Sequence, residues 1–236
     1  VVTGGLSTAA FRIPDNKKTL EVIELSGVPL VGPSANTSGK PSPTTADHVY
    51  HDLQGKITGI IDDGATRIGV ESTVLDLSDP TAMPMILRPG AVTKEQIEAV
   101  IESPVAIDQH LVKENETPKA PGMKYKHYSP DTRVLMVRDG DWSTAVQWAK
   151  NKKIRAGVIA SPEIADQVRT DTAAVYMYND NSVEAAAKGL FAGLRGLDEP
   201  TLGLDLIFVQ VYPETGLGNA YMNRLKKAAG QNYFEK

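Results

Sequence analysis

The chain has 236 residues, of which 41% are hydrophobic, so it is long enough to bury one large core or two smaller ones. Its formal net charge of −4 argues against a protein that holds nucleic acid through a broad basic surface. The absence of cysteine excludes structural disulfides and thiolate chemistry. No apolar run reaches the roughly 18 residues of a membrane span, and no signal-peptide layout is seen, so we expect a cytoplasmic protein without a membrane partner.

The first region covers residues 1–103. It opens without an initiating Met on a turn-rich stretch, so we expect another segment to precede it. Spacing typical of a capping box predicts a helix after residues 44–47 that ends at Gly55, and another from Thr93 to about Glu102. Short apolar runs predict four strands, at residues 28–31, 57–61, 73–77 and 85–87.

A linker is predicted at residues 104–130, where periodicity fades and prolines resist regular structure. The region 131–236 that follows is regular. It predicts strands at 133–137, 156–160, 173–178 and 206–211, with helices that begin at Ser143, after Ser161-Pro162, after Ser182 and at about Asn219. Right-handed crossovers would make this a small parallel sheet with helices on its faces, and the whole chain an α/β protein.

The most unusual segment is residues 32–44, which we call the polar loop. It concentrates hydroxyl groups, an amide, a lysine and two glycines directly after the apolar run 28–31. Open α/β sheets bind ligands in loops that leave the carboxyl ends of their strands. Ser34, Asn36 and Ser42 can hydrogen-bond phosphate or ribose oxygens. The loop therefore predicts a site for a polar ligand, although a solvated turn that caps the next helix has the same composition.

Two arginines stand near predicted strand ends. Arg88 follows the apolar run 85–87, and Arg12 lies between Phe11 and Pro14. A guanidinium presents a planar fork of donors that matches a phosphate or a carboxylate. Taken singly, each arginine is more typical of a surface ion pair. Only their convergence on one crevice, together with the small polar residues of 69–76, would indicate a binding site.

The linker mixes lysines with His127, Tyr125 and Tyr128. A basic and aromatic segment of this kind suits a lid that folds over an anionic nucleotide, or equally a solvated tether.

Two patterns are set aside. His48 and His51 have no third ligand nearby in the sequence, which favours a surface pair over a metal site. Gly216-Leu217-Gly218 lacks the third glycine of a dinucleotide-binding loop, so we expect it to lead into the last helix. The sequence predicts no metal site made by protein ligands.

Together these segments resemble the threonylcarbamoyl-AMP synthase family, in its long form with a YrdC-like catalytic domain, a linker and a C-terminal domain. The order and spacing of the motifs match through essentially the whole chain. The resemblance implies a partial YrdC-like twisted sheet domain followed by a small Rossmann-like domain. It rests on Pro33-Ser34-Ala35-Asn36 with 38–44, Gly69 to Val74, Leu87-Arg88-Pro89-Gly90, Ala120 to Pro130, and Gly216-Leu217-Gly218 with Met222-Asn223-Arg224-Leu225.

The resemblance implies that L-threonine, bicarbonate or carbon dioxide, and ATP are joined into threonylcarbamoyl-AMP with release of pyrophosphate. A downstream tRNA threonylcarbamoyl-transfer complex then modifies an adenosine beside the anticodon, and tRNA contact by this chain would be weak or transient. The carbamate of threonine attacks the α-phosphorus, which needs positioning and charge neutralisation more than a covalent catalytic residue. Mg²⁺ is expected to accompany the triphosphate.

The site residues implied by the resemblance follow from motif position. The ATP site would comprise Thr8, Ser34, Asn36, Ser42 and Arg88, with Tyr125 or Tyr128 closing over the nucleotide. The threonine pocket would comprise Arg12, which pairs with the carboxylate, together with Ser72 and the backbone at Gly32.

One part of the family pattern has no counterpart in this sequence. It is the N-terminal portion, which supplies a lysine and an arginine to the ATP phosphates, and we therefore expect this chain alone to have little or no activity. Two other interpretations stay open. One is a non-catalytic RNA-binding or assembly module, against which the acidic balance argues. The other is a carbamoyl-transfer domain of protein maturation, although the linker and C-terminal motifs favour the synthase.

Overall fold

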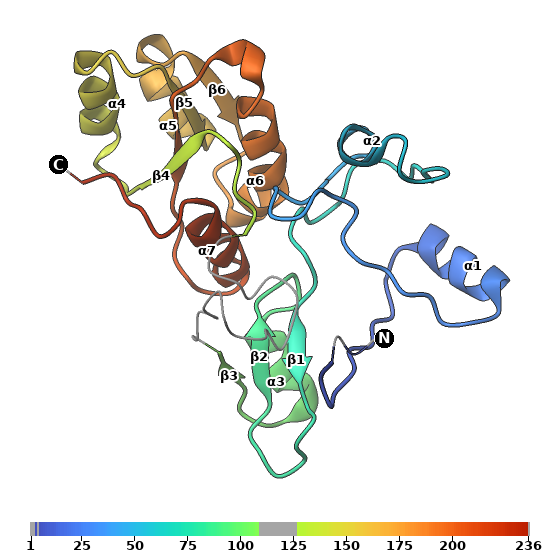
Figure 1. The fold of residues 1–236 in the computed structure, drawn as a ribbon. Helices are drawn as coiled ribbons and strands as arrows, with labels where there is room; N and C mark the ends of the chain where they lie inside the picture. Colours follow the sequence, from blue (N-terminus) through green and yellow to red (C-terminus); the bar gives the residue numbers. More distant parts are fainter. Residues whose placement is uncertain (1–2, 4, 109–126, 236) are drawn as a thin grey trace.

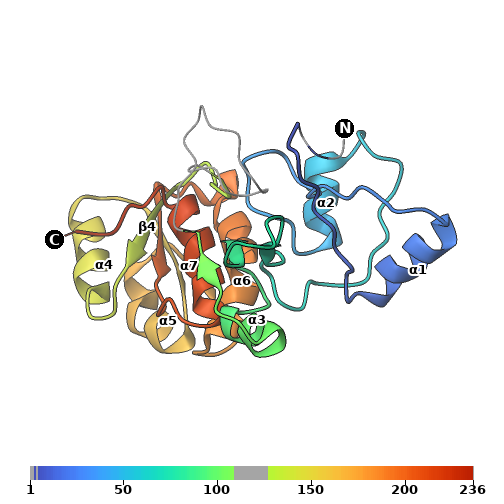
Figure 2. The same ribbon diagram turned by 90° about the horizontal axis from the view of Figure 1, so that it is seen from below.

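The computed structural model describes residues 3, 5–108 and 127–235 of the chain. These residues form two sheets, one of three strands in the order β1-β2-β3 and one of four strands in the order β4-β7-β5-β6. Figure 1 shows helix α7 between the two sheets, and both Figure 1 and Figure 2 place α1 and α2 on the opposite side of the molecule from α4. Within the described ranges no helix is long and apolar enough to cross a lipid bilayer.

The N-terminal sheet is small and mixed. Strands β1 and β2 are antiparallel, and β2 and β3 are parallel. The two predicted strands at 73–77 and 85–87 and the two predicted helices are confirmed, and the Thr93 capping box forms with Gln96. The elements of this part are α1 (Lys17–Ser26), α2 (Ala46–Leu53), β1 (Val74–Asp76), β2 (Met85–Arg88), α3 (Lys94–Ile101) and β3 (Ala106–Ile107).

Two of the predicted strands are wrong. Residues 28–31 and 57–61 are irregular, and Val31 and Ile61 are 76% and 71% exposed. A strand needs a neighbour for its ladder of hydrogen bonds, and no described strand pairs with either run. The polar loop therefore does not leave the carboxyl end of a buried strand, as its position after an apolar run had suggested.

Helix α1 is absent from the sequence-based prediction, although its end signals are present. The side chain of Asn16 accepts a hydrogen bond from the Thr19 amide at the N-terminus, and Gly27 ends the helix with a φ of 65°. These are ordinary cap residues. The helix buries none of its residues.

The C-terminal part agrees closely with the β-α-β prediction. All four strands are parallel, and Gly216-Leu217-Gly218 does lead into the last helix. The elements are β4 (Arg133–Val137), α4 (Trp142–Asn151), β5 (Ala156–Ala160), α5 (Pro162–Val168), the 3-10 turn η1 (Arg169–Asp171), β6 (Ala174–Met177), α6 (Val183–Leu197), the 3-10 turn η2 (Pro200–Leu202), β7 (Leu206–Gln210) and α7 (Leu217–Ala228).

The four-stranded sheet is covered on both faces. Alternate residues of its strands, such as Met136 and Val209, pack with α6 and α7, whereas Leu135 and Phe208 pack with α4 and α5. This alternation follows from the period of two in a strand. The result is a three-layer unit whose α6 and α7 side faces the rest of the chain.

Candidate functional site

The polar loop is irregular and connects α1 to α2. Gly39 has a φ of 86°, a conformation that favours glycine. Ser42 is buried, whereas Gly32 and Ser34 are exposed. The side-chain amide of Asn36 donates to the carbonyl oxygens of two loop residues, and its Oδ1 atom is buried with no hydrogen-bond partner among the described residues. The loop thus holds a buried acceptor that protein groups leave unsatisfied.

Ser42 is joined to the C-terminal part through a carboxylate. Its Oγ atom donates to Oε1 of Glu71 at 2.5 Å, and Nε of Arg224 donates to Oε2 of the same carboxylate at 2.7 Å. Arg224 also donates to the carbonyl oxygen of Pro89 at 2.6 Å. Its side chain is completely buried. This chain of contacts connects the polar loop, the segment after β2 and helix α7.

The charge state of Glu71 is set by these partners. Burial opposes ionisation of the carboxyl, but the positive charge of Arg224 and the hydrogen bonds from Ser42 and Arg224 outweigh it, so the net pKa is lowered. Nearby, burial together with the charges of Arg224 and Arg88 lowers the pKa of Lys227 to about 8. The cationic side chains of Arg88, Arg224 and Lys227 therefore all interact with the carboxylate of Glu71. This excess of positive charge favours an anionic ligand.

Three of the predicted site residues come together around Ser72. Nε and Nη2 of Arg88 donate to the Ser72 carbonyl oxygen at 3.2 Å and 2.8 Å. Nη1 of Arg12 lies 3.5 Å from Ser72 Oγ, on the exposed side of the residue. Burial lowers the pKa of Arg88, and the charge of Arg224 acts in the same direction. Ser72 thus links one arginine assigned to threonine with one assigned to ATP.

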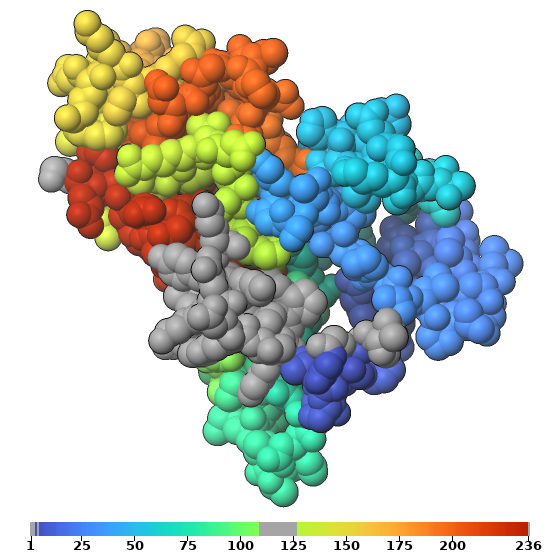
Figure 3. Space-filling model, in the orientation of Figure 1, coloured from blue at the N-terminus to red at the C-terminus, as the bar shows by residue number. Residues whose placement is uncertain are grey.

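The two tyrosines predicted to close over the nucleotide are Tyr125 and Tyr128. Tyr125 lies outside the described residues. Tyr128 is 1% exposed, its ring lies 5.2 Å from that of Phe191, and it shares a side-chain hydrogen bond with Arg88. Burial raises the pKa of Tyr128, so its hydroxyl stays neutral, and its oxygen accepts from the Arg88 guanidinium. Tyr128 is therefore packed between α6 and the arginine of the proposed nucleotide site. Figure 3 shows the segment that follows residue 127 lying against the polar loop.

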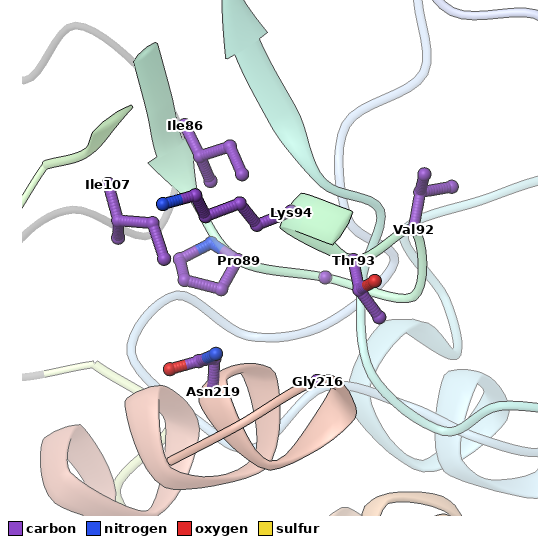
Figure 4. Close-up of a pocket in the computed structure, with 9 residues that line it drawn as sticks. Ile86, Pro89, Val92, Thr93, Lys94, Ile107, Gly216 and Asn219 are labelled. Atoms are coloured by element: carbon purple, nitrogen blue, oxygen red, sulfur yellow. The ribbon is translucent and has the colours of Figure 1, made fainter. Parts of the chain in front are cut away.

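Thr8, Gly32 and Ser34 are not part of this network. All three are exposed. A separate pocket, with room for about a single water molecule, lies where β2, β3 and the starts of α3 and α7 meet (Figure 4). Its lining includes none of the predicted site residues: it is formed by Ile86, Pro89, Gly90, Val92, Thr93, Lys94, Ile107, Gly216 and Asn219.

The two histidines set aside from the sequence have local partners. Nδ1 of His48 accepts from the Thr44 amide at 3.1 Å, and Nδ1 of His51 lies 3.0 Å from Asp52. No group of three or more His, Cys, Asp or Glu side chains that could hold a metal ion occurs in the part of the chain that the structure describes.

Four charged residues of this region received no role from the sequence: Asp52, Glu71, Arg195 and Arg224. The sequence does indicate that Arg224 is unusual, because it lies on the same face of a predicted helix as Tyr221 and Ala228. A charged side chain on an apolar helix face needs an ion-pair or hydrogen-bond partner when it is buried. Glu71 stands within a recognised motif. Asp52 and Arg195 gave no local signal, because their partners are far away in the sequence.

Two family models match the chain. The model described as "Threonylcarbamoyl-AMP synthase, C-terminal domain" matches residues 92–230, and the one described as "Telomere recombination" matches residues 1–90. Together they cover nearly the whole sequence.

Curated proteins named threonylcarbamoyl-AMP synthase give long matches. The Bacillus subtilis protein is 46% identical over 97% of this chain and 65% of its own length. The Pyrococcus abyssi protein is 45% identical over 98% of this chain and 66% of its own, and the Schizosaccharomyces pombe protein is 38% identical over 97% and 59%. The chain therefore spans less than two thirds of each of these relatives.

Solved structures agree with these matches. A crystal structure of Pyrococcus abyssi Sua5 complexed with L-threonine has a TM-score of 0.87 and 43% identity, and the match covers 99% of this chain and 67% of that one. A double alanine variant of the same protein has a TM-score of 0.85. The chain belongs to the threonylcarbamoyl-AMP synthase family.

Proposed function

We propose that this chain forms part of an L-threonylcarbamoyladenylate synthase, a nucleotidyltransferase that acts on L-threonine, bicarbonate or carbon dioxide, and ATP. The relatives that match it carry this activity in their names, and one structural neighbour is complexed with L-threonine. The observation that carries the proposal is the position of Ser72, which contacts Arg12 through its hydroxyl and Arg88 through its carbonyl. This brings a predicted amino-acid contact and a predicted nucleotide contact to one place.

The reaction requires two bonds to form. The threonine amine first forms a C–N bond with carbon dioxide and releases a proton to solvent, giving a carbamate. A carbamate oxygen then bonds to the α-phosphorus of ATP while the bond to pyrophosphate breaks. Both steps concentrate negative charge, so fixed cations that hold the reactants together supply most of what the protein must contribute.

The described residues are assigned as follows. Arg12 pairs with the threonine carboxylate, beside the Ser72 hydroxyl and the backbone at Gly32. Arg88 neutralises phosphate charge, and Tyr128 orients its guanidinium from the buried side. Thr8, Ser34, Asn36 and Ser42 bind ATP, with the unsatisfied Oδ1 of Asn36 available to accept from a ribose hydroxyl or the adenine amine.

Several further assignments belong to this proposal. Mg²⁺ accompanies the triphosphate, and because this ion is commonly held by phosphates, water and one or two carboxylates, it needs no larger set of protein ligands. The product passes to a tRNA threonylcarbamoyl-transfer complex, and contact with tRNA is weak or transient. The protein acts in the cytoplasm. Residues 1–103 form the catalytic part, 104–130 the linker and 131–236 the C-terminal domain.

The test uses the complete protein that contains this chain, incubated with ATP and bicarbonate. We expect pyrophosphate release that depends on L-threonine. Arg12→Gln should raise the threonine KM about tenfold, because a charge-assisted pair with the carboxylate is lost, while Arg133→Gln, which removes an exposed arginine at the start of β4, should not. Pyrophosphate release without threonine, or an unchanged threonine KM in Arg12→Gln, would contradict the proposal.

A further inference from the structure

Residues 39–42 of the polar loop are all bonded to residues beyond 126. Ser42 is linked through Glu71, and the other three are linked directly. The carbonyl oxygen of Gly39 accepts from the amide of Ser129 at 2.9 Å. The ammonium group of Lys40 lies 2.5 Å from a carboxylate oxygen of Asp131. These contacts join the loop to the segment that enters the C-terminal domain.

Arg195 of α6 makes a second set of contacts. Its Nε and Nη2 atoms donate to the Pro41 carbonyl oxygen at 3.1 Å and 2.6 Å. Nη1 and Nη2 also bind the two carboxylate oxygens of Asp52 at 3.1 Å and 2.8 Å. Asp52 in turn accepts from the Thr37 amide at 3.0 Å. The side chains of Arg195 and Asp52 are only 12% and 5% exposed, so this pair fixes both ends of residues 37–41.

Ser42 is held from a third direction, through Glu71 and Arg224 of α7. Arg195 and Arg224 therefore approach the loop from two different helices of the same domain. The loop has no regular structure of its own, and such a segment pays an entropic cost when a ligand orders it. Contacts made before the ligand arrives reduce that cost.

We propose that Arg195 and Arg224 are positioning residues, through which the C-terminal domain holds residues 37–42 in the conformation that receives ATP. The identity of the ligand rests on the proposed function, whereas the restraint of the loop does not. The C-terminal domain thereby takes part in nucleotide binding, although none of its side chains contacts the substrate.

The first experiment compares Arg195→Gln and Arg195→Lys with the parent in the complete protein. We expect Arg195→Gln to raise the ATP KM about tenfold, with the threonine KM and kcat within about twofold of the parent. Arg195→Lys should recover only part of the loss, because an ammonium group cannot reproduce the planar fork. A variant that had merely lost folded protein would lower kcat and leave the ATP KM unchanged, and that result would overturn the proposal.

Two further variants make the test specific. Asp52→Asn should also raise the ATP KM, and the double variant Arg195→Gln/Asp52→Asn should be less impaired than the product of the two single effects, because both remove one contact. Arg169→Gln is the matched control, because Arg169 pairs with Asp166 on the exposed surface of the same domain. Multiplicative effects, or an equal rise in Arg169→Gln, would count against the proposal.

A second measurement separates this inference from the proposed function. Amide hydrogen exchange at residues 37–42, without substrates, should be at least about tenfold faster in Arg195→Gln than in the parent. If the complete protein releases no threonine-dependent pyrophosphate, the proposed function fails while the exchange result still decides whether the loop is restrained. Unchanged exchange at residues 37–42 would overturn the restraint itself. Arg224 is fully buried, and its replacement could prevent folding. The experiments therefore replace Arg195.

Discussion

Buried arginines are stabilised here by several acceptors each. Arg224 donates to Glu71 and to the Pro89 carbonyl oxygen, and Arg195 donates to Asp52 and to the Pro41 carbonyl oxygen. Removing a charge from water is costly unless the group is paired and hydrogen-bonded. Removing one partner of such a pair therefore lowers the free energy of unfolding by more than the intact pair contributes to it, because the other charge stays buried without a partner.

The stability that the pair of Arg195 and Asp52 contributes depends on pH. The hydrogen bond from Arg195 holds the pKa of Asp52 well below its usual 3.8, against the opposing effect of burial. A carboxyl whose pKa is lower in the folded state adds stability above its unfolded pKa and loses it as the pH falls. We predict that Arg195→Gln lowers the free energy of unfolding by about 3 kcal/mol at pH 7, and that this difference narrows below about pH 4.

Urea unfolding of the parent and Arg195→Gln across this pH range provides the measurement. Arg169→Gln should differ from the parent by no more than about 1 kcal/mol, because its ion pair is exposed. A difference between parent and Arg195→Gln that stayed constant down to about pH 2 would show that the Asp52 carboxylate is not the partner that matters.

At the level of single residues, the sequence predicted the residues of the recognised motifs but not the side chains that pair with them. Ser42, Ser72 and Arg88 stand in motifs whose residue types suit phosphate or carboxylate. The pairing of Arg195 with Asp52 bridges 143 positions, and no local pattern records which distant carboxylate a guanidinium will meet. Ser34 stands in one of these motifs and Thr8 in a neighbouring loop, yet the structure leaves both exposed, so their roles stay predictions.

Helix α6 packs closely against the segment that carries Glu71. Gly69 has a φ of 84°, and a Cβ atom there would lie 2.4 Å from Cα of Lys188 and 2.6 Å from the Ala187 carbonyl oxygen. Real Cβ atoms do not approach backbone atoms this closely. The glycine is therefore required both by its backbone conformation and by the proximity of α6.

Gly64 provides a matched comparison for Gly69. Its φ is 80°, but a Cβ atom added to it would meet nothing within 4 Å. We predict that Gly64→Ala costs about 1 kcal/mol, from backbone strain alone, and that Gly69→Ala costs at least about 2 kcal/mol more, because α6 must move. Chemical denaturation of both variants measures the difference. Equal losses would mean that the segment and α6 are not in contact in solution.

The strands that were predicted most accurately are the most deeply buried ones. The strands β4, β5 and β7 are buried along nearly their whole length and were predicted within a residue at each end. The apolar runs at 28–31 and 57–61 have the composition of strands but no described neighbour to pair with, and α1 has helix caps but no buried face. Composition alone does not show which apolar runs find a partner.

On the scale of the whole molecule, α7 connects the two sheets. One face of this helix packs into the core beneath β4 and β7, and Arg224 extends from it to Glu71. The predicted boundaries at residues 103 and 130 stay predictions, and the two family models meet between residues 90 and 92. Periodicity located the C-terminal sheet, whereas the contacts that join it to the rest depend on charges distant in the sequence.

This connection predicts how the complete protein unfolds. We expect the parent to unfold in a single calorimetric transition, because the two parts share buried charge pairs. In the double variant Arg195→Gln/Glu71→Gln, which removes the charge from both buried ion pairs, the transition should separate into two, since weakly joined domains unfold independently. Differential scanning calorimetry distinguishes these cases, with Arg169→Gln as control. A single transition retained in the double variant would show that the two parts stay coupled without these two charge pairs.

The bond between Glu71 and Arg224 has a consequence for recombination between homologues. The two residues stand 153 positions apart, so a crossover at any point between them separates a carboxylate from the guanidinium that neutralises it. A grafted C-terminal half would support the host only if it supplied arginines at both 195 and 224. In a hybrid without them, the N-terminal half would keep two carboxylates, at Glu71 and Asp52, whose guanidinium partners are missing.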